Sequence, residues 1–166
     1  MPIEIERKFL LADESWRRQA DAGIKMCQGY LSNNSKSSIR VRISGDKAAL
    51  NIKSATPGCV RREYEYAVPL AEAAEMLHDL CHETLIEKVR YHVDYAGFIW
   101  EIDVFSGLNQ GLVVAEIELE DINQEFPRPA WLGREVSDEI RYYNSHLAAY
   151  PYCRWSAAEI DHGNCL

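Results

Sequence analysis

Acidic residues in this sequence occur in pairs two positions apart. Glu4 and Glu6 form one pair near the start of the chain, and Glu116 and Glu118 form another. Residues two apart lie on one face of a β-strand, so each pair can point both carboxylates in the same direction. Mutual repulsion raises the pKa of such carboxyls unless a cation lies among them. We therefore expect these four side chains to hold a divalent metal ion.

Basic residues follow the same spacing, as in Arg40 with Arg42 and in Lys88 with Arg90. The arginine fork and the lysine point charge both match phosphate oxygens. The basic positions on strand-like segments are Lys8, Arg40, Arg42, Lys53, Lys88 and Arg90. We expect this set to bind the phosphates of an anionic ligand.

The strand-like segments carry nearly balanced charge. Against these six cations stand seven carboxylates, which are Glu4, Glu6, Glu63, Glu65, Asp103, Glu116 and Glu118. Their net charge of −1 becomes +1 or +3 when one or two divalent cations bind. Such a balance suits a compact polyanion bound together with its metal, because hard cations take carboxylate and phosphate oxygens together.

Turn residues at short intervals predict many strands joined by hairpins. We expect strands at about residues 2–11, 25–32, 37–44, 47–54, 59–68, 83–95, 97–105 and 112–121. Three helices fit around them. One is capped by Asp13 and ends before Gly23, one spans residues 70–80, and one spans residues 137–150.

A single charged strand face is most simply explained by exposure to solvent. Seven strands with almost entirely charged polar faces, basic on some and acidic on others, favour charges that face each other across an enclosed space. The sequence therefore predicts a mainly β, α+β fold. We expect an eight-stranded antiparallel closed barrel with a polar, charged lumen and helices packed outside it.

Composition is that of an ordinary globular domain. The 166 residues are 47% hydrophobic and 27% charged, with a net charge of −8 that argues against non-specific nucleic-acid binding. No apolar run is long enough for a membrane span, and early charges argue against a signal peptide. Five scattered cysteines show no metal or disulfide spacing. We expect free thiols and a cytoplasmic protein.

Taken together, these segments resemble the CYTH domain, also called the triphosphate tunnel metalloenzyme family. The family signature E-x-E-x-K is present as Glu4-Ile5-Glu6-Arg7-Lys8. Further matching elements follow in order, and they are Gln28-Gly29-Tyr30-Leu31, Arg40-Val41-Arg42, Lys53, Arg61-x-Glu63-x-Glu65, Lys88-Val89-Arg90, Asp103 and Glu116-Ile117-Glu118. Asn51 departs from the pattern, because the family often has Thr two residues before the strand lysine.

The resemblance implies a tunnel domain over residues 1–150, followed by a C-terminal tail over 151–166. It also implies a linear triphosphate bound with Mg²⁺ or Mn²⁺. A compact single domain looks most like the inorganic triphosphatases, which would cleave triphosphate to pyrophosphate and phosphate. The alternatives are an adenylate cyclase, a thiamine- or nucleoside-triphosphatase, or a non-catalytic polyphosphate-binding module. The family often forms homodimers, and no nucleic-acid or membrane partner is expected.

The resemblance also suggests roles for single residues. Glu63, Glu65 and Asp103 would hold the phosphate-binding cations in place. Lys88, crowded by other cations, would have a lowered pKa and act as the base, with Tyr30 as its partner. A water held by the metal is the other route to a nucleophile. Arg61 receives no role.

Overall fold

The computed structural model describes residues 3–55 and 59–160, and in them the chain forms nine strands. The strands are β1 (Ile3–Leu11), β2 (Ile24–Asn33), β3 (Ser37–Ser44), β4 (Lys47–Ser54), β5 (Val60–Ala67), β6 (Ile86–Tyr95), β7 (Phe98–Phe105), β8 (Val113–Glu118) and β9 (Leu132–Glu135). All strand pairings are antiparallel, and their order is β5-β4-β3-β2-β6-β7-β8-β1-β9. The predicted strands are confirmed, with ends that differ by a few residues.

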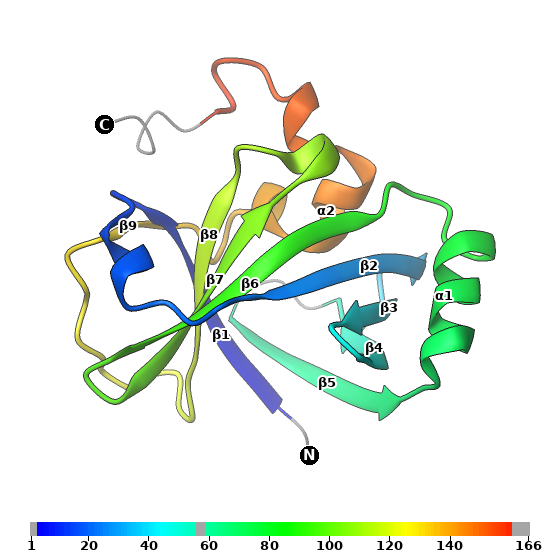
Figure 1. Ribbon diagram of the computed structural model, residues 1–166, viewed down its shortest axis with the longest axis horizontal. Helices are drawn as coiled ribbons and strands as arrows, with labels where there is room; N and C mark the ends of the chain where they lie inside the picture. Colours follow the sequence, from blue (N-terminus) through cyan, green and yellow to red (C-terminus); the bar gives the residue numbers. More distant parts are fainter. Residues whose placement is uncertain (1–2, 56–58, 161–166) are drawn as a thin grey trace.

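The sheet closes on itself through β5 and β1. Three residue pairs make this contact, with Ile3 opposite Arg62, Glu4 opposite Arg61 and Ile5 opposite Val60. The expected eight-stranded antiparallel barrel is therefore confirmed (Figure 1).

The ninth strand, β9, was not predicted. It pairs with the end of β1 and contains Gly133, where a Cβ atom would lie 2.8 Å from the Leu10 carbonyl oxygen. Because the strand has only four residues and depends on this close backbone approach, the sequence has no alternating run that would reveal it.

Besides the strands, residues 3–55 and 59–160 form two helices and four short 3₁₀ turns. They are η1 (Ser15–Arg18), α1 (Leu70–Asp79), η2 (Gly107–Asn109), η3 (Ile140–Tyr142), α2 (Asn144–Ala149) and η4 (Tyr152–Arg154). The helix predicted at residues 70–80 is confirmed as α1. Among the described residues, no helix has the length and apolar character that spanning a bilayer requires.

The other two predicted helices were too long. The first is only the turn η1, because Ala20 forms a bridge with Val93 and the backbone must be extended there. The second is broken at Tyr143, whose φ of −72° and ψ of 137° are extended. The Tyr143 hydroxyl donates to the Ser137 carbonyl oxygen at 2.8 Å, which fixes this break.

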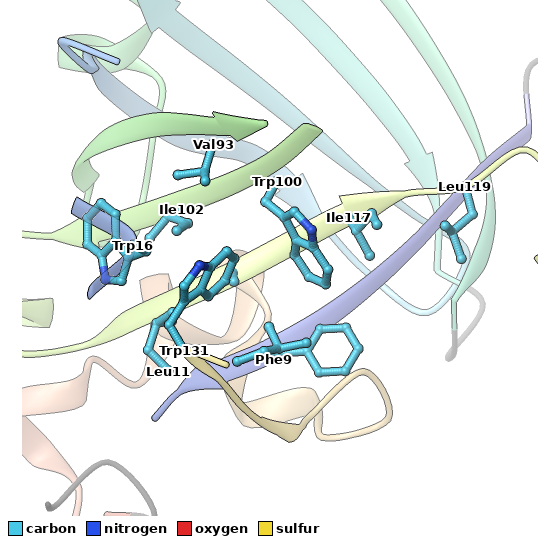
Figure 2. Close-up of a cluster of buried hydrophobic side chains, with 11 residues drawn as sticks. Phe9, Leu11, Trp16, Val93, Trp100, Ile102, Ile117, Leu119 and Trp131 are labelled. Carbon is cyan, nitrogen blue, oxygen red and sulfur yellow. The ribbon is translucent and has the colours of Figure 1, made fainter. Parts of the chain in front are cut away.

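The outer face of the barrel is covered by apolar packing, as the alternation predicted. On one side, Trp100 packs edge-on against Phe9 and Trp131, with ring centroids 5.7 and 5.5 Å apart (Figure 2). On another side, Ala73 and Leu77 of α1 cover the outer face of β3 and β4.

A third apolar cluster lies inside the barrel, at one end of the lumen. Leu10 and Val114 share strand faces with Lys8 and Glu116, so they point into the same interior. Leu147 of α2 and Trp155 pack against this end. The lumen is therefore charged over part of its length and closed by hydrophobic side chains beyond it.

Trp155 anchors the C-terminal segment to the barrel. Its ring lies 5.2 Å from that of Tyr142 and 5.0 Å from that of Tyr152. Its indole nitrogen donates to the Tyr150 carbonyl oxygen at 3.3 Å. Residues 151–155 thus pack on the barrel's closed end. The rest of the predicted tail up to residue 160 is described, and residues 161–166, with Cys165, lie outside the described residues.

Candidate active site

A cavity of about 220 Å³ lies in the charged part of the barrel. The cations and the tyrosine proposed from the sequence that line it are Lys8, Arg40, Arg42, Lys53, Arg90 and Tyr30. The carboxylates proposed from the sequence that line it are Glu4, Glu6, Glu63, Glu65, Glu116 and Glu118. Lys88 and Asp103 are the sequence-predicted site residues that do not reach its surface.

The carboxylates cluster where β1 and β8 pair. Glu6 lies opposite Glu118 and Lys8 lies opposite Glu116 in the antiparallel register. Burial and the nearby Glu116 raise the pKa of Glu6, and burial together with Glu4 raises the pKa of Glu118. Negative charge is therefore in excess at this part of the wall, as the acidic pairs predicted.

Two of these carboxylates already have cationic partners within hydrogen-bond distance. Lys53 Nζ lies 2.7 Å from Glu4 Oε1, and Glu116 accepts from both Lys8 and Arg90 at 2.7 Å. Although burial opposes it, the charges of Lys8 and Arg90 hold the pKa of Glu116 well below its usual range. Consistent with this pairing, no three acidic, histidine or cysteine side chains of the described chain are arranged as a ready-made metal site.

The oxygen donors nevertheless fit a hard divalent cation. Glu6 and Glu118 lie opposite each other in the β1–β8 register, and both line the cavity. A cation between them would offset both the burial of their negative charge and their mutual repulsion. The chemistry of the carboxylates thus suits the metal that the acidic pairs predicted.

The opposite wall, made by β3, β4 and β5, holds the arginines. Arg42 Nη2 lies 3.1 Å from Glu65 Oε2, and Arg40 Nη2 lies 3.9 Å from Glu63 Oε1. Asn51 is fully buried between the two glutamates and donates to Glu63 at 2.8 Å and to Glu65 at 2.5 Å. The residue that departs from the family pattern therefore fixes the carboxylates that face the arginines.

Lys88, Asp103 and Arg90 form a buried network behind the cavity. Lys88 Nζ lies 2.5 Å from Asp103 Oδ2, and Arg90 donates twice to Asp103 at 2.7 Å. Arg90 also donates to Glu116 and to Glu101, so its nitrogens are largely occupied by carboxylates. Asp103 thus holds two cations, as expected from the sequence.

Burial, with a further contribution from Arg90, lowers the pKa of Lys88 to about 8, although Asp103 opposes the shift. The direction agrees with the expectation from the sequence, whereas the main cause is burial rather than crowding by cations. The Lys88 side chain is 2% exposed.

Tyr30 lines the cavity beside a different set of charges. Burial raises the pKa of Tyr30, and Arg40, Lys8 and Arg61 oppose that rise. On β2 the residue opposite Lys88 is Met26, which is four residues from Tyr30. The partnership of Tyr30 with Lys88 stays a prediction.

Several cavity residues had no assigned role in the sequence. Arg61 and Glu101 line the wall, and both follow alternations that also contain assigned residues, so their spacing could have identified them. Tyr143, Asn144 and Ser145 also line it. They precede or begin α2, and no strand periodicity marks them.

Comparison with known proteins gives consistent matches. The CYTH domain model matches residues 2–147. An inorganic triphosphatase of Acetivibrio thermocellus is 46% identical over 152 residues, covering 92% of this chain and 97% of that protein. An inorganic triphosphatase of Nitrosomonas europaea is 36% identical over 149 residues, covering 87% of this chain and 96% of that protein. The crystal structure of the inorganic triphosphatase NE1496 superposes with a TM-score of 0.63 at 33% identity, covering 89% of this chain and 95% of that one.

Proposed function

This chain belongs to the CYTH domain family, and we propose that it is an inorganic triphosphatase. It would hydrolyse one anhydride bond of triphosphate to release pyrophosphate and phosphate. The observation that carries the proposal is the enclosed cavity of about 220 Å³, with carboxylates on β1 and β8 and cations on β3 and β4. A small polyanion bound together with a divalent cation complements both walls.

Arg40, Arg42 and Lys53 are proposed to bind the phosphate oxygens directly. Each lines the cavity, and each has a glutamate partner whose negative charge offsets its positive charge. Phosphoryl transfer depends mainly on positioning and on neutralising oxygen charge. A preorganised donor in such a site contributes on the order of 3 kcal/mol to the reaction.

Lys8, Lys88 and Arg90 complete the proposed phosphate-binding set. Carboxylates of Glu116 and Asp103 already occupy much of their hydrogen-bonding capacity. We propose that they act on the phosphates chiefly through positive charge at the inner part of the cavity. Glu63, Glu65 and Asp103 keep the cations oriented.

Glu4, Glu6, Glu116 and Glu118 are proposed to hold Mg²⁺ or Mn²⁺. The position of all four carboxylates on the cavity wall supports this assignment, because Glu6 lies opposite Glu118 in the β1–β8 register. When bound, the metal neutralises phosphate oxygens and makes water more acidic. Glu4 would become available to the metal if Lys53 left their ion pair to bind a phosphate.

Lys88 is the proposed proton acceptor for the attacking water, with Tyr30 as its partner. A pKa of about 8 leaves a substantial fraction of neutral amine at alkaline pH. The position of Lys88 behind the cavity surface requires a test that separates proton transfer from structural support. That test is the dependence of kcat on pH, described in the Discussion.

A substrate panel tests the proposed function. Triphosphate, ATP, thiamine triphosphate and pyrophosphate are each supplied with Mg²⁺ or Mn²⁺ at neutral and alkaline pH, and phosphate and cyclic AMP are measured. We expect phosphate release to be fastest from triphosphate and to stop in excess chelator. Faster cyclic AMP formation from ATP, or binding of triphosphate without turnover, would contradict the proposal.

A pair of variants on one strand connects the panel to the cavity. Lys53→Ala removes a cation that lines the cavity, whereas Lys47→Ala removes an exposed one at the start of β4. We expect Lys53→Ala to lower kcat/KM for triphosphate by roughly 100-fold. Lys47→Ala should match the unmodified protein.

A further inference from the structure

We propose that Arg61 is a further phosphate-binding residue of the cavity and that the ring of Tyr143 positions it. The inference rests on the proposed function and adds two residues to it. Both side chains line the cavity. The guanidinium carbon of Arg61 lies 5.3 Å from the centroid of the Tyr143 ring.

The guanidinium of Arg61 keeps hydrogen-bonding capacity that Arg90 has lost. Its acidic neighbour is Glu6, with Nη2 to Oε1 at 3.8 Å, which is longer than a hydrogen bond. Its Nε is buried and has no hydrogen-bond partner among the described residues. Arg90, in contrast, donates to Asp103, Glu101 and Glu116. A buried donor without a partner is costly, so a ligand oxygen that accepts from it is strongly favoured.

Arg61 lies at the junction of the two walls. It is on β5, the strand that closes the barrel between β4 and β1, and it pairs in register with Glu4. A guanidinium keeps its proton in proteins, and the Glu6 carboxylate lies 3.8 Å from Arg61 Nη2. Arg61 therefore presents a cation beside the carboxylates proposed to hold the metal. The phosphate group nearest those carboxylates is the one that Arg61 would bind.

Tyr143 fixes the plane of this guanidinium. Its hydroxyl donates to the Ser137 carbonyl oxygen at 2.8 Å, which holds the ring in place. Arginine stacks on aromatic faces and keeps the edge of its fork free for bidentate contacts with phosphate. The segment before α2 thus contributes to the site through an aromatic ring, in addition to closing the lumen.

Adjacent arginines provide a matched experiment. Arg61→Ala removes the proposed contact, and Arg62→Ala removes the next side chain, which is exposed and points to the opposite face of β5. Steady-state kinetics with triphosphate and isothermal titration with triphosphate are measured for both. We expect Arg61→Ala to raise KM and weaken binding by roughly 10- to 100-fold, as for a lost hydrogen bond to a charged group. Arg62→Ala should leave both unchanged.

Two further variants separate binding from folding. Arg61→Lys keeps the charge without the planar fork and should recover only part of the affinity. Tyr143→Leu removes the ring and should raise KM several-fold with a smaller change in kcat. Thermal unfolding without ligand checks that each variant is folded. If Arg61→Ala does not fold, Arg61→Lys decides, and an unchanged KM in that variant overturns the inference.

The outcomes distinguish this inference from the function on which it rests. Normal triphosphate hydrolysis by the unmodified protein together with unchanged kinetics in Arg61→Ala overturns the inference alone. Failure of the unmodified protein to bind or hydrolyse triphosphate overturns both. A selective rise in KM for Arg61→Ala, with Arg62→Ala normal, supports both.

Discussion

Replacing Asp103 by Asn tests whether the buried charge network holds the barrel together. Asp103 is fully buried and accepts hydrogen bonds from Lys88 and from two nitrogens of Arg90. The amide of Asn has nearly the same shape as the carboxylate but carries no charge and presents a donor to the two cations. The variant therefore leaves Lys88 and Arg90 with uncompensated charge inside the barrel.

The expected cost follows from this geometry. Breaking a buried ion pair by removing one partner costs about 3–5 kcal/mol, because the remaining charge stays desolvated. For a chain of this size, each kcal/mol corresponds to about 2–4 °C in Tm, so Asp103→Asn should lower Tm by roughly 6–20 °C. Because Glu116 and Glu101 still contact Arg90, we expect a decrease in Tm near the lower end of this range.

Urea unfolding and thermal melts at neutral pH measure the effect. The control is Glu14→Gln, which removes an exposed ion pair with Arg17 and should change the unfolding free energy by less than about 1 kcal/mol. Adding Lys88→Met to Asp103→Asn removes one of the two stranded charges and should recover part of the loss. An Asp103→Asn protein as stable as the unmodified one would refute the reasoning.

Three other variants test separate parts of the structure. In the unmodified protein, kcat measured from pH 6 to 10 should rise through about pH 8, as Lys88 loses its proton, and then level off. The Lys88→Arg variant should lack this inflection. Lys88 is neutral between pH 8 and 10.5 only when folded, so its contribution to stability increases with pH over that window. Folding raises the pKa of Glu118, so its ionised carboxylate destabilises the folded protein, and Glu118→Gln should raise the Tm of the metal-free protein. The variant should also lose the further rise in Tm that Mg²⁺ produces in the unmodified protein, and calorimetry measures both effects. Trp155→Ala should destabilise the protein by about 3–5 kcal/mol in urea unfolding, and an unchanged midpoint would mean that the C-terminal segment does not close the lumen.

Alternation along the chain was sufficient to identify most of the barrel and most of the cavity wall. Glu4 and Glu6, or Arg40 and Arg42, must share a strand face once the segment is extended, because side chains alternate with a period of two. Charge on one face and apolar residues on the other also identify the interior side. For this reason the strands, the closed barrel and most of the lining residues could be predicted from the sequence.

Alternation does not specify where along the barrel axis a side chain lies, or which side chains of other strands face it. Lys88 shares a face with Arg90, yet burial and Asp103 place it behind the cavity surface. Leu10 follows Lys8 on the same face, yet it belongs to the apolar cluster that closes the lumen. These positions depend on strand register and on which segments cover the barrel ends, and neither is a property of a single strand.

The residues that face the interior can be read from the sequence, because strand geometry and charge patterning are local. The contact between Arg61 and Tyr143 and the hydrogen bonds from Asn51 to Glu63 and Glu65 depend instead on the folded chain. The same holds for the break before α2. Arg61 and Tyr143 are far apart along the chain, and their contact exists because closure of β5 onto β1 and packing of the C-terminal segment bring them to one wall. Contacts of this kind arise from the folded chain as a whole, so no local pattern encodes them.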